Sequence, residues 1–535
     1  MDLQEVLEFL QQQSAGEKKQ KIFLLVLGMV LLIAAAFFFL QFTGKKTVTV
    51  EITDRQSGQP LDAKITIATF SQVLAVGESK NGSAVFAGID AREKVRVIVE
   101  KKGYKSVGVE LEPSQTNVEA SLEREILRTS METMAIVTSS KNLERKYGAE
   151  TAKEIISKAT ELAQTINETE PIGASLYVID SKESSEGHGF ALAENPDDAR
   201  QVLASIYSIV QKTRPAYLLI VGGPRIIPFQ KIENPLAMDE NRVSFDFVIK
   251  ASPTIETDNL YGMFETPSPI ERTFFPDVAV ARIPDGIEIN MEGDKLLVEI
   301  MQNAIDKHRQ KARQQASFST FTSDDSILDY YGKFLFTKTG PNDVLKSPEF
   351  FNYIPETMQV NENATREINT LVDNSSIMIV LLHGNEPFAE QALAGIGFND
   401  QRQYMAYSPA EMQETDFYGK TILIDSCWGA SLERPANAAL PIIALRKGAN
   451  AFMGSTETAL SISRKSYKSI GKESDLSYLG VSNSLIYLMS KKLSEGETIG
   501  KAFLEAKKSL SWGSEPEYLT NAEFVLYGDP TLKIG

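Results

Sequence analysis

The chain contains very few of the side chains that build disulfides and zinc sites. Its 535 residues include one cysteine, Cys427, and three histidines. A single cysteine excludes an intramolecular disulfide and every cysteine-rich zinc site, and three scattered histidines argue against a histidine-based metal centre. We therefore expect a functional site that uses neither a metal nor a cofactor.

Basic residues are also in deficit. Lys and Arg number 55 against 71 Asp and Glu, which gives a formal net charge of −16. Nucleic acids and anionic membrane surfaces select basic protein faces, so this balance argues against nucleic acid as a partner and is compatible with a basic substrate. The hydrophobic content of 42% suits globular cores, and the length suits roughly two to four domains.

Charge is absent from the segment IFLLVLGMVLLIAAAFFFL, residues 22–40. Nineteen uncharged residues are enough to cross a bilayer as a helix. A cleaved signal peptide would have a shorter apolar region followed by a small-residue cleavage site, whereas here AAA runs straight into FFFLQF. The sequence therefore predicts a membrane anchor at 22–42 that contacts the lipid bilayer, after a short cytoplasmic tail at 1–21. The excess of lysines before the span is slight, so an extracytoplasmic body is favoured and an intracellular one stays open.

Residues 46–123 alternate apolar and polar side chains in short runs such as TVTVEIT, AKITIAT and KVRVIVE, separated by turn residues. This pattern predicts a small antiparallel β-sandwich. The VEKKGYKSV hairpin that ends at Val107 resembles the Gly-Tyr signature of carboxypeptidase-regulatory-like domains. We interpret this domain as a spacer without chemistry of its own.

From about residue 131 strands alternate with helices. MAIVTSS, GASLYVIDS and AYLLIVGG are separated by helical stretches, and the alternation restarts with SFSTFTSDD, SSIMIVLLHG, KTILIDSC and NAFMGST. Such alternation predicts the α/β class, with a mostly parallel sheet covered by helices on both faces. We expect two subdomains, at 131–310 and 311–535.

Two apolar runs of the second subdomain end on reactive side chains. IMIVLLHG places His383 before a glycine, and TILIDSC ends on Cys427. In a parallel sheet the carboxyl ends of neighbouring strands share one edge, so the two side chains would face one crevice. An imidazole lowers the pKa of an adjacent thiol and supplies a thiolate nucleophile. The backbone amides of Gly384 and Cys427 would then form an oxyanion hole.

Each residue also has a simpler interpretation. A lone cysteine at a strand end is often an inert, small apolar side chain, and a histidine before glycine is often a turn residue. The two matching apolar runs, in this order, favour the catalytic dyad.

The order of an apolar block, His-Gly, a spacer, a second apolar block and Cys resembles the caspase-like cysteine peptidases, and among them the gingipain type. Further segments agree with that type over about 131–535: PAYLLIVGGPRIIPF (215–229), TDNLYG (257–262), FPDVAVARIP (275–284) and FVLYGDPTLKI (524–534). The resemblance implies a caspase-like fold and cysteine endopeptidase activity on protein or peptide substrates. Cys427 would be the nucleophile and His383 the general base and then acid.

The chain also departs from the family pattern. Leu381 and Leu382 precede the His-Gly pair, Ser426 precedes the cysteine and the bulky Trp428 follows it. A catalytically inactive caspase-like scaffold that binds a protein partner is therefore the alternative hypothesis. The residue that orients the imidazole stays open among Asp246, Glu256 and Glu386, and a calcium site in the acidic segment TSDDS (322–326) stays open as well.

Two acidic residues point to a basic substrate. Asp425 lies two residues before the nucleophile, so strand alternation would direct both side chains to one side. Asp258 in TDNLYG matches the acidic residue that lines the pocket of arginine-specific gingipains. We expect these carboxylates to bind an Arg or Lys side chain on the N-terminal side of the scissile bond.

Overall fold

The structure is a computed structural model. It describes residues 45–534 except for the segments 56, 70–72, 91–94, 102–103, 105, 113–114, 123–131, 235–251, 266–274, 311–316, 323–341, 347–374, 385–392, 397–402, 408, 460–479 and 511–514. The predicted tail and membrane span at 1–42 lie outside the described residues, and none of the described helices has the length and apolar character needed to cross a membrane. Residue contacts divide the chain into two units, one ending at Leu127 and one beginning at Arg128.

The first unit is a β-sandwich of two sheets, with strand orders β4-β1-β7 and β3-β2-β5-β6. Alternate side chains such as Val48, Val50 and Ile52 of β1 fill its core. The strands are β1 (Lys45–Asp54), β2 (Lys64–Thr69), β3 (Val73–Glu78), β4 (Ser83–Asp90), β5 (Val95–Glu100), β6 (Val107–Leu111) and β7 (Asn117–Leu122).

The prediction of an entirely antiparallel sandwich was wrong at one pairing. β7 runs parallel to β1, with Thr49 beside Asn117 and Asp54 beside Leu122. Neighbouring strands joined by a short turn must run antiparallel, but β7 follows the second sheet in the chain and enters the first sheet after a crossover, which leaves its direction free.

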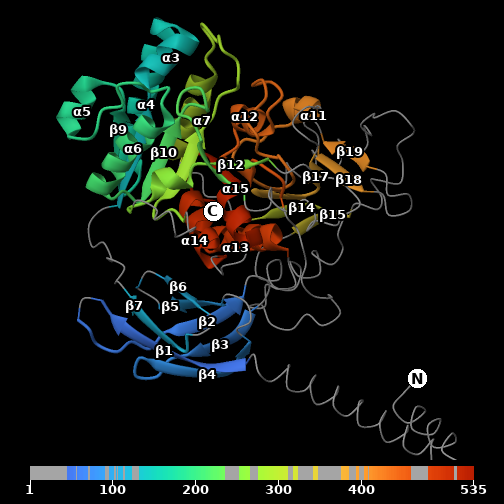
Figure 1. Ribbon diagram of the computed structural model, residues 1–535. Coiled ribbons are helices and arrows are strands. Elements are labelled where there is room, and N and C mark those ends of the chain that lie inside the picture. The colour runs from blue at the N-terminus through green and yellow to red at the C-terminus, as the bar shows by residue number, and fades with distance from the viewer. Residues whose placement is uncertain are drawn as a thin grey trace, which may run out of the picture. The chain divides into compact units, whose positions relative to one another are not determined.

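The second unit is built on one ten-stranded sheet, in the order β15-β14-β16-β20-β21-β22-β13-β10-β8-β9 (Figure 1). All neighbours run parallel except β21 and β22. The strands are β8 (Glu132–Thr138), β9 (Ile172–Val178), β10 (Tyr217–Val221), β13 (Ala279–Ile283), β14 (Phe318–Thr322), β15 (Asn342–Lys346), β16 (Ile377–Leu381), β20 (Thr421–Asp425), β21 (Ala451–Ser455) and β22 (Phe524–Gly528). The predicted α/β class with a mostly parallel sheet is confirmed.

The strands of the two predicted subdomains form two blocks of this sheet. The last strand of the chain, β22, lies where the blocks meet, between β21 and β13. Its burial is complete along its length, as expected for a central strand with covered faces. The two blocks therefore share a continuous sheet within one compact unit.

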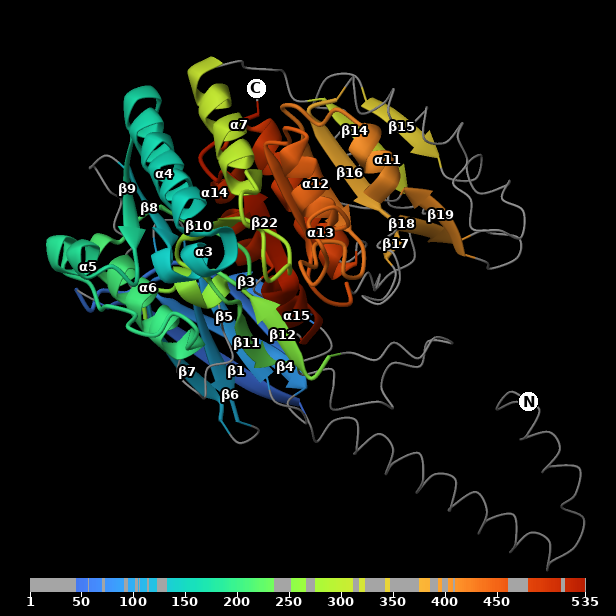
Figure 2. The ribbon, with the colours of Figure 1, turned by 90° about the horizontal axis from the view of Figure 1, so that it is seen from above.

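Helices cover both faces of the sheet. α4, α7 and α12 contact one another in sequence along one face (Figure 2), and α13 and α14 pack together against β20 and β13. The helices are α3 (Ser140–Tyr147), α4 (Ala149–Thr169), α5 (Lys182–His188), α6 (Ala199–Thr213), α7 (Leu296–Gln310), α11 (Pro409–Glu414), α12 (Leu440–Arg446), α13 (Val481–Ser494), α14 (Ile499–Ser509) and α15 (Glu515–Glu523).

Local sequence explains where these helices begin and what they bury. In α6, the Asp198 side chain accepts a hydrogen bond from the Arg200 amide and so caps the first turn. Val202, Ile206 and Ile209 recur at helical spacing and are buried against the sheet.

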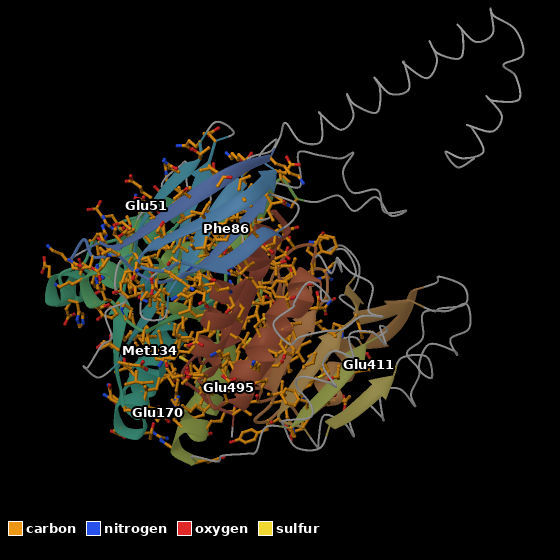
Figure 3. The ribbon with its side chains drawn as sticks, turned by 90° about the horizontal axis from the view of Figure 1, so that it is seen from below. Glu51, Phe86, Met134, Glu170, Glu411 and Glu495 are labelled. Atoms are coloured by element: carbon orange, nitrogen blue, oxygen red, sulfur yellow. The ribbon has the colours of Figure 1, made fainter. Side chains whose placement is uncertain are left out.

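Buried charged groups tie α7 to the end of the chain. His308 Nε2 lies 3.0 Å from Asp529 Oδ2, and His308 Nδ1 lies 3.3 Å from Glu170 Oε1 just after α4. Glu170, labelled in Figure 3, directly follows the last residue of α4. Burial alone would lower the pKa of His308, but the two carboxylates raise it to about 9. The imidazolium therefore holds α7, α4 and the segment after β22 together.

Candidate active site

The strands that carry His383 and Cys427 are direct neighbours. β16 and β20 run parallel, and the register places Leu381 beside Asp425. The amide of Leu382 continues the ladder by donating to the Asp425 carbonyl oxygen at 3.2 Å. His383 and Cys427 each follow this rung by two residues, so the topology brings both to the same edge of the sheet.

The glycine after the histidine packs directly on the cysteine. A Cβ atom added to Gly384 would overlap the Cys427 carbonyl oxygen and would lie 2.5 Å from Ser426 Oγ. Only a residue without a side chain lets β17 (His383–Gly384) approach the cysteine loop this closely. The backbone of the His-Gly pair is thereby fixed against the backbone of Cys427.

β17 belongs to a second small sheet. His383 pairs with Ala394 of β18 (Leu393–Ile396), and β18 pairs with β19 (Gln403–Tyr407). The sheet adds a lateral anchor for the histidine backbone beyond the end of β16.

The Cys427 thiol lies against the segment that follows β21. Its Sγ is 3.8 Å from the Ala459 carbonyl oxygen. Burial raises the pKa of the thiol to about 12, and the nearby charges of Asp425 and Glu523 act in the same direction. A cationic partner or entering water would be needed to generate the thiolate in this surrounding.

Trp428 bends the chain immediately after Cys427. Its φ of 52° lies in the left-handed region, which a bulky residue rarely adopts. Its amide donates to the Glu457 carbonyl oxygen at 2.7 Å, and its side chain is 8% exposed. These contacts hold the sharp turn that follows β20. The turn places Cys427 against the neighbouring segments of the chain.

Asp425 is the last residue of β20, so the strand alternation behind the predicted shared side of Asp425 and Cys427 does not extend to the cysteine. Asp425 is 6% exposed, and its carboxyl accepts a hydrogen bond of 2.8 Å from Ser482 Oγ on α13. Burial raises its pKa to about 6, against the opposing hydrogen bond from Ser482. Its contact in this structure is with a helix of the same chain.

Asp258 is engaged by an arginine of the same chain. Arg282 Nε lies 2.9 Å from Asp258 Oδ2 and Arg282 Nη2 lies 2.5 Å from Oδ1, a bidentate pair. Arg282 is fully buried and also donates to the carbonyl oxygens of Gly222 and Ile227. Because both Asp258 oxygens are already bound, this carboxylate is not open to a substrate side chain here.

Of the remaining candidate residues, the structure describes Glu256 but not Asp246 or Glu386. Glu256 lies on β12 (Thr254–Thr257), where its carboxylate is 3.2 Å from Lys231 Nζ of β11 (Gln230–Glu233). Asp246, Glu386 and nearly all of the acidic segment 322–326 lie outside the described residues. Over the described part of the chain, no group of His, Cys, Asp or Glu side chains has the arrangement of a metal site.

Two acidic residues near Cys427 escaped the sequence analysis. Glu457 follows the end of β21, the next parallel strand after β20, and Glu523 is buried at the end of α15, immediately before β22. The rule that singled out His383 and Cys427, a polar side chain at the carboxyl end of a parallel strand, also applies to Glu457. Glu523 gave no such signal because it precedes β22, which runs antiparallel to β21.

Comparison with known proteins gives a family match. The model of Peptidase family C25 matches residues 133–535. No curated protein matches the chain significantly. Among solved structures, the Arg-specific cysteine proteinase gingipain R is 13% identical, with 76% of this chain and 79% of that chain covered and a TM-score of 0.48. Latent PorU from Porphyromonas gingivalis is 9% identical, with 92% and 50% covered and a TM-score of 0.29.

Proposed function

The chain belongs to peptidase family C25 and is a cysteine peptidase, and from this premise we propose that it cleaves peptide bonds with a Cys427–His383 dyad. The observation that carries the assignment is the β16–β20 register, which brings the two residues to one edge two positions beyond the Leu381–Asp425 rung. The close packing of Gly384 on Cys427 supports it.

The proposed reaction is acyl transfer through a thioester. His383 accepts the thiol proton, and Cys427 Sγ attacks the scissile carbonyl carbon. The resulting oxyanion receives hydrogen bonds from the amides of Gly384 and Cys427. His383 then donates its proton to the leaving amine as the C–N bond breaks. Water, deprotonated by His383, hydrolyses the thioester and regenerates the thiol.

We further propose that the enzyme prefers Arg or Lys on the N-terminal side of the scissile bond. The support is electrostatic: the charges of Asp425 and Glu523 act on the Cys427 thiol, that of Glu457 acts on Glu523, and the chain carries a net charge of −16. A cationic side chain entering such surroundings is attracted, whereas an acidic one is repelled.

Anchoring of the peptidase to a membrane is part of the same proposal. The uncharged segment 22–40 supports it, with the catalytic unit outside the cytoplasm and surface or secreted proteins as substrates. Cell fractionation followed by protease treatment of intact cells tests it. Recovery of the full chain in the soluble fraction would refute the anchor, and protection of the catalytic unit in intact cells would reverse the orientation.

Hydrolysis of fluorogenic peptides that differ only at the residue before the scissile bond tests the catalytic proposal. We expect cleavage after Arg or Lys, a loss of about 10³-fold or more in Cys427→Ala, and a loss of about 10²–10⁴-fold in His383→Ala. Cleavage after Asp or Asn but not after Arg or Lys would refute the specificity. Correctly folded protein that cleaves no peptide but captures one would favour the inactive scaffold.

A further inference from the structure

The backbone of Glu457 is hydrogen-bonded to Trp428, the residue that follows the proposed nucleophile Cys427. Its carbonyl oxygen accepts hydrogen bonds from the Trp428 amide at 2.7 Å and from Ser455 Oγ at 2.8 Å. Two residues later, the Ala459 carbonyl oxygen lies 3.8 Å from Cys427 Sγ. The segment 457–459 therefore runs past the thiol, and a substrate bound at Cys427 would contact it.

The Glu457 side chain lies where both predicted subdomains contribute residues. It hydrogen-bonds to the side chains of Trp428 and Ser252, and Ser252 precedes β12 of the small β11–β12 sheet. The neighbouring Thr456 Oγ1 donates to the Glu256 carbonyl oxygen of β12 at 3.0 Å. This placement fixes the carboxyl between Trp428 and the β11–β12 hairpin.

Three acidic side chains lie near one another at this position. Burial, aided by the charges of Glu256 and Glu433, raises the pKa of Glu457 to about 7. Arg434 interacts electrostatically with Glu433. Glu256 has Lys231 at 3.2 Å. Within the part of the chain that the structure describes, no lysine or arginine forms an ion pair with Glu457 or Glu433. A carboxylate in such surroundings is stabilised when a cation enters.

Asp258 and Asp425, the two acidic residues expected from the sequence to bind the basic side chain of the substrate, have partners within the chain. Asp258 is bound at both oxygens by Arg282, and Asp425 is buried against Ser482. Glu457 differs from both, since its hydrogen bonds come from neutral donors and no ion pair with a described residue neutralises it.

We propose that Glu457 is the specificity-determining residue that binds the basic side chain of the substrate, with Glu256 and Glu433 adding to the negative potential of the pocket. The inference rests on the proposed peptidase function and names the group that selects its substrate. Trp428 and Ser252 hold the carboxyl in position, and the cation of an Arg or Lys side chain completes the charge balance.

The variant Glu457→Gln tests this proposal, because the amide keeps the size of the side chain and one acceptor oxygen and removes the charge. The peptide probes carry Arg or its neutral isostere citrulline before the scissile bond. We expect KM for the Arg peptide to rise by about 30-fold or more, with a much smaller change in kcat and none for citrulline. Glu144→Gln, an exposed acid on α3, controls for the loss of one negative charge.

The split between KM and kcat separates recognition from a structural role. A merely structural Glu457 would lower kcat for both peptides, and this result, or an unchanged ratio of Arg to citrulline cleavage, would overturn the inference.

Binding of the same two peptides to the full-length Cys427→Ala variant gives a readout that needs no hydrolysis. We expect Glu457→Gln in that background to weaken Arg-peptide binding and leave citrulline binding unchanged. If the parent chain hydrolyses nothing yet shows this Glu457-dependent preference, the peptidase proposal fails and the recognition inference stands. Binding that ignores Glu457 refutes the inference regardless of hydrolysis.

Discussion

Gly384 and Cys427 are in such close backbone contact that no side chain fits between them. A Cβ on Gly384 would overlap the Cys427 carbonyl oxygen. We predict that Gly384→Ala lowers kcat/KM by about 100-fold, because a displacement of about 1 Å at a reacting group has effects of that size. Steady-state hydrolysis of the preferred peptide measures it.

A glycine elsewhere provides the matched control. A Cβ on Gly187 of α5 meets nothing within 4 Å, so Gly187→Ala should retain full activity. Circular dichroism spectra of both variants check that the fold is kept. Full activity in Gly384→Ala would mean that the approach of β17 to the cysteine loop is unimportant for catalysis.

Much of this site could be predicted because parallel sheets obey simple rules. The apolar runs before His383 and Cys427 gave both strands, and their assumed adjacency is confirmed by the β16–β20 pairing. The alternation of strands and helices also gave the α/β class. These features depend on local pattern, which a single sequence contains.

Pairings between distant segments could not be predicted in the same way. No local sequence pattern around Asp258 indicates Arg282 as its partner, and none around Asp425 indicates Ser482 on α13. The position of β22 between β21 and β13 could not be predicted either, because several strand orders are compatible with the same local sequence patterns. Such contacts depend on tertiary packing and become visible only in the folded chain.

The Asp258–Arg282 pair gives a prediction about stability. Arg282 is fully buried, so Asp258→Asn would leave a charge without its counter-ion. We expect a loss of about 3–5 kcal/mol in the free energy of unfolding, measured by urea denaturation, with the Arg preference of the folded enzyme unchanged. Asp197→Asn, which breaks the exposed pair with Arg145, should cost less than about 1 kcal/mol.

The opposite pattern would restore the earlier assignment. If Asp258→Asn is as stable as the parent protein but loses its preference for Arg, then Asp258 binds the Arg side chain of the substrate and its contact with Arg282 contributes little to stability.

Asp425 gives a prediction with a pH dependence. Burial raises its pKa to about 6, above the value of about 3.9 expected when unfolded. Between these values the folded protein binds more protons than the unfolded chain, so this group lowers stability as pH rises from 4 to 6. Asp425→Asn cannot ionise, so its stability relative to the parent should increase by about 2–3 kcal/mol over that range.

Denaturation of the two proteins at pH 4 and pH 7 measures the difference directly. Peptide profiling accompanies it, because loss of the preference for Arg and Lys in Asp425→Asn would contradict a purely internal role for this carboxyl. A pH-independent stability difference would show that Asp425 is not the group that titrates.

His308 gives a second pH dependence, of the same sign as that of Asp425 but at higher pH. Its pKa is raised from 6.5 to about 9 by Asp529 and Glu170, so the stabilisation is complete below pH 6.5 and is lost as pH rises through 9. We expect His308→Gln to be less stable than the parent by about 3 kcal/mol at pH 6 and nearly equal at pH 9.5. Lys307, whose pKa burial lowers to about 7, titrates in the same range in both proteins. His188→Gln, at the exposed end of α5, should show no such convergence; a constant gap between His308→Gln and the parent would mean that packing, and not the imidazolium charge, joins α7 to the segment after β22.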